Sequence, residues 1–329
     1  MNLDPADMQD HEIPPTPLYE RGAGGIFGRG RFQAKLVIPG WTLPRWGPAQ
    51  DNVEPMIDEK RVENIRTYGV HHNTGAQRTK VLFEDLGLAK DRKAEYVILS
   101  GCHPPETLPR AFRALKGLFD HFRISYTFLS KETCCGWMPL GQPAVMAKDE
   151  AAIAGAKELA RGFIQENFKQ AEALGAKSVV LFCAACEPTY TNFKKAVNLE
   201  VISCSELLER FFTGGKLERE IDYYAGCYRF RRRITREPID VGAARRILSK
   251  IDGLRVHEAD NSLCCFVRPH LDHLAGSFRT KEVVAICTGC YNLLQNALKD
   301  RGKYKLRMIP ELLWEAVQGM DKPLRDGEE

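Results

Sequence analysis

The stretch "AKSVVLFCAAC" (residues 176–186) decides the predicted fold, because an apolar run of strand length ends there in a C-x-x-C motif. The stretch "EVVAICTGC" (residues 282–290) repeats this pattern. Short apolar runs bounded by turn residues are typical of buried strands. Open α/β sheets usually bind their ligands outside the carboxyl ends of the strands. The two stretches therefore predict two α/β units, each with a cysteine site at one edge of its sheet.

The elements around these two stretches are repeated as well. The first copy contains predicted strands at 94–102 and 124–130 and helices at 108–122 and about 149–174, and the second contains strands at 219–227 and 254–257 and a helix at about 241–251. Downstream, "LEVISCSELLERF" (199–211) resembles "LRMIPELLWEAV" (306–317). Cys183 and Cys287 are 104 residues apart, and Glu206 and Glu311 are 105 apart. Such self-similarity indicates an internal duplication.

We therefore predict an α/β fold with two duplicated, Rossmann-like, cysteine-rich domains related by pseudo-twofold symmetry. The predicted segments are a mostly irregular N-terminal extension (1–92), a first domain (93–218), a second domain (219–320) and a polar tail (321–329). Within the extension we expect helices at about 58–67 and 79–86. Its Gly-rich segment at 21–31 follows no predicted strand, which argues against a dinucleotide fingerprint. We expect the extension to lie against the domains or a partner subunit.

Composition excludes several classes of protein. The chain has 329 residues, 44% hydrophobic and 27% charged, with a net charge of +4, which is typical of a soluble protein and gives no indication of nucleic-acid binding. No apolar run approaches the roughly 18 residues of a membrane helix, and the first residues do not form a secretory signal. Eleven cysteines in such a chain favour a reducing, cytoplasmic location and metal ligation over disulfides.

Ten of the eleven cysteines fall into two copies of one pattern, which is a single cysteine, an adjacent pair and a C-x-x-C motif. The first copy consists of Cys102, Cys134, Cys135, Cys183 and Cys186, and the second of Cys227, Cys264, Cys265, Cys287 and Cys290. Adjacent cysteines rarely bond to each other, and adjacent thiolates repel unless a cation neutralises them. We therefore interpret these ten as ligands. Cys204 aligns with Ile309 and is expected to be a small buried hydrophobe.

Five thiols per copy are one more than a zinc ion or a conventional cubane cluster takes. One Cys₄ zinc site built from the two C-x-x-C motifs would leave six thiols unexplained. Iron–sulfur ligation with a bridging cysteine accounts for the count better, although the ordinary ferredoxin run is absent. A structural zinc protein remains the remote alternative.

The two C…CC…C-x-x-C copies, over roughly residues 94–317, resemble the cysteine-rich "CCG" domains of the heterodisulfide reductase B subunit family. The resemblance implies that each five-cysteine set binds a noncubane [4Fe-4S] cluster. It implies reduction or formation of a disulfide or sulfur-carrier bond, with a small thiol, disulfide or protein-bound sulfur carrier as substrate. It also implies two partners, a ferredoxin-like (C-type) subunit and a flavin-containing (A-type) subunit.

Two features depart from this family, namely Phe266, which replaces the glycine of the motif in the second copy, and the N-terminal extension. Both leave the identity of the disulfide open. CCG domains also occur in quinone-linked dehydrogenase complexes, so an electron-transfer subunit without disulfide chemistry is the alternative function.

Several other residues near the cysteines are candidates for the site. Arg229 and Arg231, followed by Arg232 and Arg233, could hold an anionic thiol carrier or form a solvated helix face or partner contact. His103 could donate protons as thiolates form, as could His270 and His273, or each could be a surface or supporting histidine. Trp137 and Phe266 are expected to shield the clusters from water.

Overall fold

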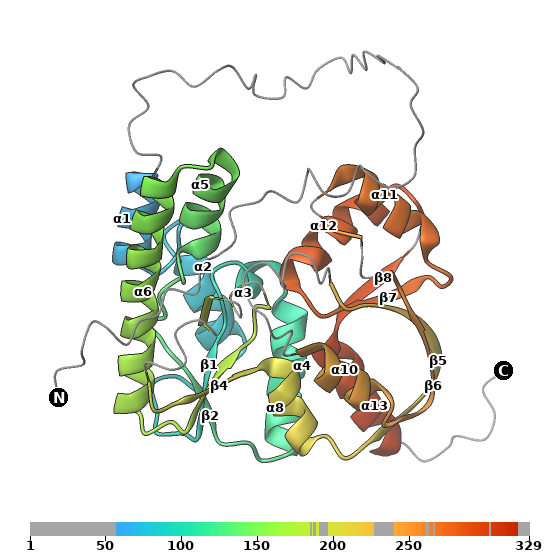
Figure 1. Ribbon diagram of the computed structural model, residues 1–329. Coiled ribbons are helices and arrows are strands. Elements are labelled where there is room, and N and C mark those ends of the chain that lie inside the picture. The colour runs from blue at the N-terminus through green and yellow to red at the C-terminus, as the bar shows by residue number, and fades with distance from the viewer. Residues whose placement is uncertain are drawn as a thin grey trace, which may run out of the picture.

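Two four-stranded parallel sheets form the centre of the protein, with strand orders β2-β1-β3-β4 and β6-β5-β7-β8. The computed structural model describes residues 57–184, 186, 189–190, 197–226, 240–260, 263–265, 267–302 and 304–321. Helices cover both sheets, and the chain passes from the first sheet to the second without returning (Figure 1). The fold is therefore α/β, as predicted.

The first sheet is built around β1, which pairs with β2 on one side and with β3 on the other, and β3 pairs with β4. Its strands are β1 (Tyr96–Leu99), β2 (Tyr126–Phe128), β3 (Ser178–Leu181) and β4 (Glu200–Ser203). The main helices of this half are α4 (Pro109–His121), α6 (Glu150–Ala173) and α8 (Cys204–Phe211). Shorter helical segments are α3 (Pro104–Thr107), η3 (Trp137–Gly141) and α5 (Gln142–Ala147).

Both faces of this sheet are buried, because successive strand residues point to opposite faces and all of β1 is apolar. Tyr96 and Ile98 belong to the core that contains the apolar side chains of α4 and α8. Val97 and Leu99 belong to the core on the other face, which contains α6. That second core also includes four cysteines of the first set, so the sheet places them in an apolar environment.

The second sheet repeats the connectivity of the first, with β5 paired to β6 and β7, and β7 paired to β8. Its strands are β5 (Gly215–Tyr224), β6 (Ile251–Glu258), β7 (Glu282–Ala285) and β8 (Lys305–Met308). Its helices are α10 (Asp240–Leu248), α11 (Arg268–Ser277), α12 (Thr288–Leu298) and α13 (Ile309–Asp321). The described parts of the two halves therefore share one strand order.

The two halves pack against each other through helices. Helix α4 lies against α13 and α8 against α10, and all four contribute to one continuous core (Figure 1). On α4, Gly117 makes room for the ring of Trp314, since a Cβ atom there would lie 2.6 Å from that ring. The guanidinium of Arg110 donates to the Tyr291 hydroxyl at 3.3 Å, also between the halves.

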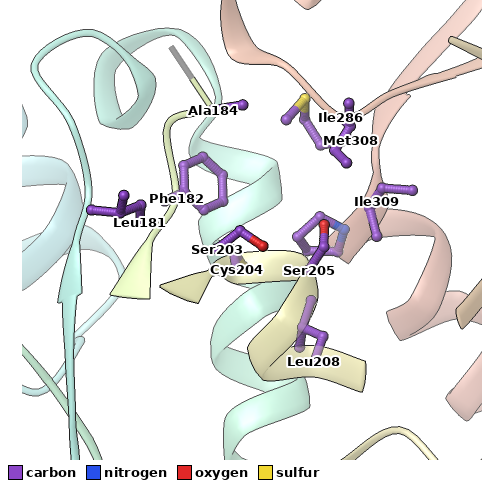
Figure 2. Close-up of a pocket in the computed structure, with 11 residues that line it drawn as sticks. Leu181, Phe182, Ala184, Ser203, Cys204, Ser205, Leu208, Ile286, Met308 and Ile309 are labelled. Carbon is purple, nitrogen blue, oxygen red and sulfur yellow. The ribbon is translucent and has the colours of Figure 1, made fainter. Parts of the chain in front are cut away.

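The starts of α8 and α13 have matching local structures. The carboxylate of Glu206 accepts the backbone N–H of Ser203 at 2.7 Å, and the carboxylate of Glu311 accepts that of Met308 at 2.9 Å. Between these helix starts is a small apolar cavity with Cys204 on one side and Ile309 on the other (Figure 2). Cys204 and Ile309, which correspond in the sequence, therefore also occupy corresponding positions in the structure, each as the first residue of its helix.

Residues 57–92, the described part of the mostly irregular extension, contain helical elements close to the two helices predicted at about 58–67 and 79–86. They form α1 (Glu59–Tyr68), α2 (Ala76–Thr79) and the π-helical segment η2 (Lys80–Asp85). Val62 and Ile65 on one face of α1 are buried in the same core as Val97, and this burial explains the regular structure. Residues 1–56, residues 322–329 and the short gaps between the described ranges lie outside the described residues. Among the described helices, none is long and apolar enough to cross a membrane.

Candidate metal centre

The five cysteines of the first set converge at the carboxyl edge of the first sheet. Cys102 follows β1, Cys134 and Cys135 follow β2, and Cys183 and Cys186 follow β3. All five line one cavity, and all but the half-buried Cys102 are buried. The structure thus brings together residues separated by more than 80 positions in the chain, as the strand-end pattern predicts.

The sulfurs of this set contact one another in a continuous series, from Cys102 to Cys134, Cys135, Cys186 and Cys183. The sulfurs of Cys135 and Cys186 are 3.7 Å apart. Two thiolates on one tetrahedral ion, with metal–sulfur bonds of about 2.3 Å, would lie roughly 3.8 Å apart, whereas a disulfide bond is only about 2 Å long. All ten described cysteines are free of disulfides. The donor set therefore fits a thiophilic metal centre.

Hydrogen bonds in the first set converge on the sulfur of Cys135, the middle sulfur of the series. The pKa of the Cys135 thiol is well below its usual range because its sulfur forms hydrogen bonds with the thiols of Cys134 and Cys186 and accepts from the backbone N–H groups of Trp137 and Met138. Contact with neighbouring thiols and burial raise the pKa values of Cys134 and Cys186. A buried thiolate without a cation is unfavourable, and a bound metal would neutralise it.

A buried carboxylate fixes the loop that carries Cys102. One oxygen of Glu132 accepts the backbone N–H of Gly101 at 2.7 Å, and the other accepts the backbone N–H and hydroxyl of Ser100 at 2.8 and 2.7 Å. Burial raises the pKa of Glu132, against the opposing effect of the Arg78 guanidinium. Glu132 directly precedes the Thr-Cys-Cys segment, so this one side chain ties the loop after β1 to the loop after β2.

Asn167 of α6 holds the segment before the cysteine pair. Its amide oxygen accepts the backbone N–H of Thr133 at 2.8 Å, and its amide nitrogen donates to the Thr133 carbonyl at 2.6 Å and to the Tyr190 hydroxyl at 2.7 Å. Asn167 is fully buried and Tyr190 nearly so. Such hydrogen-bonded supports commonly fix the orientation of metal ligands.

The second cysteine set is described for four of its five members. The sulfurs of Cys265 and Cys290 are 3.3 Å apart, and Cys287 contacts Cys290. The backbone N–H of Cys264 donates to Nδ1 of His270 at 3.2 Å, so this histidine supports the adjacent pair. Cys227, Phe266, Arg229, Arg231 and the two arginines after them lie outside the described residues. His273 is exposed on α11.

The two sets meet at their C-x-x-C motifs. The sulfur of Cys183 is 3.2 Å from the hydroxyl oxygen of Thr288, which lies between Cys287 and Cys290. The first residue of α12 in the second half therefore contacts a cysteine of the first half.

Histidines from two parts of the chain gather beside Cys102 and Cys134. His103 is exposed, and its Nε2 is 3.3 Å from Nε2 of His71, while Nδ1 of His71 is 3.9 Å from the Cys134 sulfur. Burial, then the nearby His103 and His72, lower the pKa of His71 to about 4. His71 and His72 were not among the site residues predicted from the sequence, although the adjacent histidines in "VHHN" (70–73) were a signal.

Cys204 and Trp137 occupy the environments that the sequence suggested. Cys204 is buried outside both sets, and burial raises the pKa of its thiol to about 12. Trp137 is 8% exposed and packs in the core that contains Cys134 and Cys135. The predicted burial of Cys204 is confirmed.

Comparison with known proteins identifies the first cysteine site. Residues 96–189 match the family model described as "CCG: Cysteine-rich domain", a range that contains the whole first set. A CCG cysteine-rich domain is therefore present in this half, and domains of this class indicate an iron–sulfur or electron-transfer role. No curated protein matches the chain.

Solved structures with partial similarity to this chain include a glutamate racemase and an aspartate racemase homologue. A glutamate racemase from Bacillus anthracis shares 14% identity over 70% of this chain and 80% of its own, with a TM-score of 0.32. An aspartate racemase homologue from Pyrococcus horikoshii shares 13% identity over 68% of this chain and 96% of its own, with a TM-score of 0.29. Similarities at this level carry no argument about fold or function.

Proposed function

We propose that this chain is the iron–sulfur catalytic and electron-transfer subunit of a heterodisulfide-reductase-like complex. In this proposal it reduces or forms a disulfide or sulfur-carrier bond at two noncubane [4Fe-4S] clusters. The observation that supports it most directly is the buried, connected group of five thiols in the first set, together with its contact to the second set through Cys183 and Thr288.

The two halves would be duplicated cysteine-rich domains, since their sheets share one strand order. In each half an adjacent cysteine pair follows the second strand and a C-x-x-C motif follows the third strand. Cys102, Cys134, Cys135, Cys183 and Cys186 would hold the first cluster, and Cys227, Cys264, Cys265, Cys287 and Cys290 the second. When bound, such clusters supply single electrons for breaking or forming a sulfur–sulfur bond.

The chain's own residues would set the properties of the first centre. Burial of four of its five cysteines excludes water. The N–H groups of Trp137 and Met138 donate to the Cys135 sulfur, and hydrogen bonds to cluster sulfurs and low solvent exposure both tune reduction potentials. The half-buried Cys102 lies on the more open side, beside His103, where a substrate sulfur would approach.

The contact between Cys183 and Thr288 would shorten the path for electrons between the centres. A ferredoxin-like subunit would deliver these electrons from a flavin-containing subunit. The same centres would suit the alternative function, an electron-transfer subunit of a quinone-linked dehydrogenase.

Anaerobic purification with iron and sulfide analysis, followed by electron paramagnetic resonance (EPR) during titration with candidate disulfides, tests the proposal. We expect about eight irons per chain, as two four-iron clusters require, and a new paramagnetic signal with one disulfide. Cys186→Ser should lose about half of the iron, and the matched control Cys204→Ser should lose none. If the protein contains iron but the intact complex neither responds to disulfides nor turns them over, the quinone-linked alternative is favoured. If the protein contains only zinc, a zinc-stabilised scaffold is favoured.

A further inference from the structure

A loop outside the matched cysteine-rich domain packs directly onto the first centre. The loop comprises residues 69–75, between α1 and α2. The backbone carbonyl of Gly69 accepts the N–H of Cys134 at 2.8 Å. The buried Arg78 donates to the carbonyl oxygens of Gly69 at 3.2 Å and Glu132 at 2.8 Å. These bonds join the loop to the cysteine pair through main-chain atoms.

Gly69 allows this close approach. Its φ of +70° is in the left-handed region, and a Cβ atom there would lie 2.2 Å from the backbone oxygen of Glu132. A larger residue would push the loop away from the cysteine pair. The position of the next histidine along the loop, His71, is therefore fixed by backbone contacts and by a glycine.

His71 directs a ring nitrogen towards the sulfurs. Its Nδ1 is 3.9 Å from the Cys134 sulfur, and His71, Cys102 and Cys134 each bring one ligand atom within 4.8 Å of the others. With metal–nitrogen bonds of about 2.0 Å and metal–sulfur bonds of about 2.3 Å, two ligands of one tetrahedral ion would lie roughly 3.5 Å apart. A shift of a few tenths of an ångström would therefore let His71 and Cys134 share one metal ion.

The other ring nitrogen of His71 faces the ring nitrogen of a second histidine, His103. Its Nε2 lies 3.3 Å from Nε2 of His103, whose ring stacks on that of His72 with centroids 4.0 Å apart. Nε2 of His72 is 3.3 Å from the carboxylate of Glu106, which also accepts from Asn73. With metal on Nδ1, His71 carries its proton on Nε2 and would donate it to Nε2 of His103, and a hydrogen bond from the second ring nitrogen fixes the tautomer and orientation of a ligating ring.

We propose that His71 is a sixth donor of the first centre, binding metal through Nδ1 on the side of Cys102 and Cys134, with His103 as its positioning residue. This inference rests on the proposed function, since it requires a metal in the first centre. It assigns residues 57–92 a part in the site. The first centre would then have a mixed cysteine and histidine ligand set, in contrast to the all-cysteine set implied by the resemblance.

Pulsed EPR on the full chain, purified anaerobically after labelling with ¹⁵N-histidine and then reduced, tests this assignment without any mutation. We expect a strong hyperfine coupling from a histidine nitrogen. The coupling should disappear in His71→Ala and persist in the matched control His121→Ala, which changes an exposed histidine at the end of α4. His103→Ala should keep the coupling but change its magnitude, because the orientation of His71 is released.

The outcomes separate the two proposals. Iron with a cluster spectrum but no histidine coupling in the labelled wild-type chain would overturn the role of His71 and leave the proposed function standing. A coupling that survives in His71→Ala would also overturn it. A chain without iron would overturn the proposed function, and the sixth donor with it.

Discussion

The sulfur of Cys183 lies 3.2 Å from the hydroxyl oxygen of Thr288, so a ligand candidate of the first centre contacts the C-x-x-C motif of the second. A metal-bound thiolate can only accept a hydrogen bond, so in a loaded centre the threonine would be the donor. The threonine thus belongs to the immediate surroundings of both sets. If both sets hold metal, as we propose, Thr288 is a residue through which one half would affect the reduction potential of the other.

Replacing Thr288 with valine should lower the midpoint potential of the first centre. A donated hydrogen bond stabilises the additional negative charge of the reduced state, so its removal disfavours reduction. Potentiometric titration followed by EPR would measure the shift. Thr288→Ser keeps the hydroxyl and should restore the wild-type value, whereas equal potentials in all three proteins would contradict a hydrogen bond to Cys183.

Cys204 should be inert over the ordinary pH range. Its pKa of about 12 means that the reactive thiolate forms only as the pH rises towards that value. Iodoacetamide at about pH 8 should therefore leave Cys204 unmodified in the folded chain and modify it after unfolding in urea. Peptide mass mapping of the folded and unfolded samples measures the modification of Cys204. Rapid modification in the folded chain would contradict a buried thiol with a raised pKa.

The sequence predicted the ligand candidates because their positions follow from strand topology. Cys102, Cys183 and Cys287 come directly after apolar strands, and the carboxyl ends of parallel strands meet at one edge of a sheet. Cys204 could be set apart because its counterpart in the repeat is the apolar Ile309. These inferences needed only local pattern and repetition.

The supporting residues could not be predicted in this way. Asn167 reaches Thr133 from the middle of a long helix, and His71 reaches Cys134 from a loop 63 positions away. Neither contact produces a periodic pattern, because each depends on how a helix or loop packs on the sheet. Glu132 carried only a weak signal, an acidic residue two positions before the adjacent cysteine pair.

Asn167→Ala should destabilise the first half more than Tyr190→Phe. The first change removes three hydrogen bonds and leaves the main-chain groups of Thr133 without partners, at a cost of about 2–3 kcal/mol, whereas the second removes one hydrogen bond worth about 1 kcal/mol. Urea unfolding of the anaerobically purified proteins would measure both free energies. Equal effects would mean that the contact of Asn167 with Thr133 contributes little.

The packing of α4 on α13 should tolerate no added atom at Gly117. A Cβ atom there would lie 2.6 Å from the ring of Trp314, and both elements belong to the shared core of the two halves. Gly117→Ala should therefore lower the free energy of unfolding by about 1–3 kcal/mol, the usual cost of overpacking. The helix-propensity gain of alanine, about 1 kcal/mol, offsets part of this loss and leaves a net destabilisation of up to about 2 kcal/mol.

Gly162→Ala on α6 is the matched control for this change, because it is the same substitution in a helix with no atom within 4 Å of the added Cβ. The control should raise the free energy of unfolding by about 0.5–1 kcal/mol through helix propensity alone. Urea denaturation of both variants beside the wild type measures the difference, and opposite signs are expected. If Gly117→Ala were as stabilising as the control, Trp314 would have to move freely, and the close packing between the two halves would be refuted.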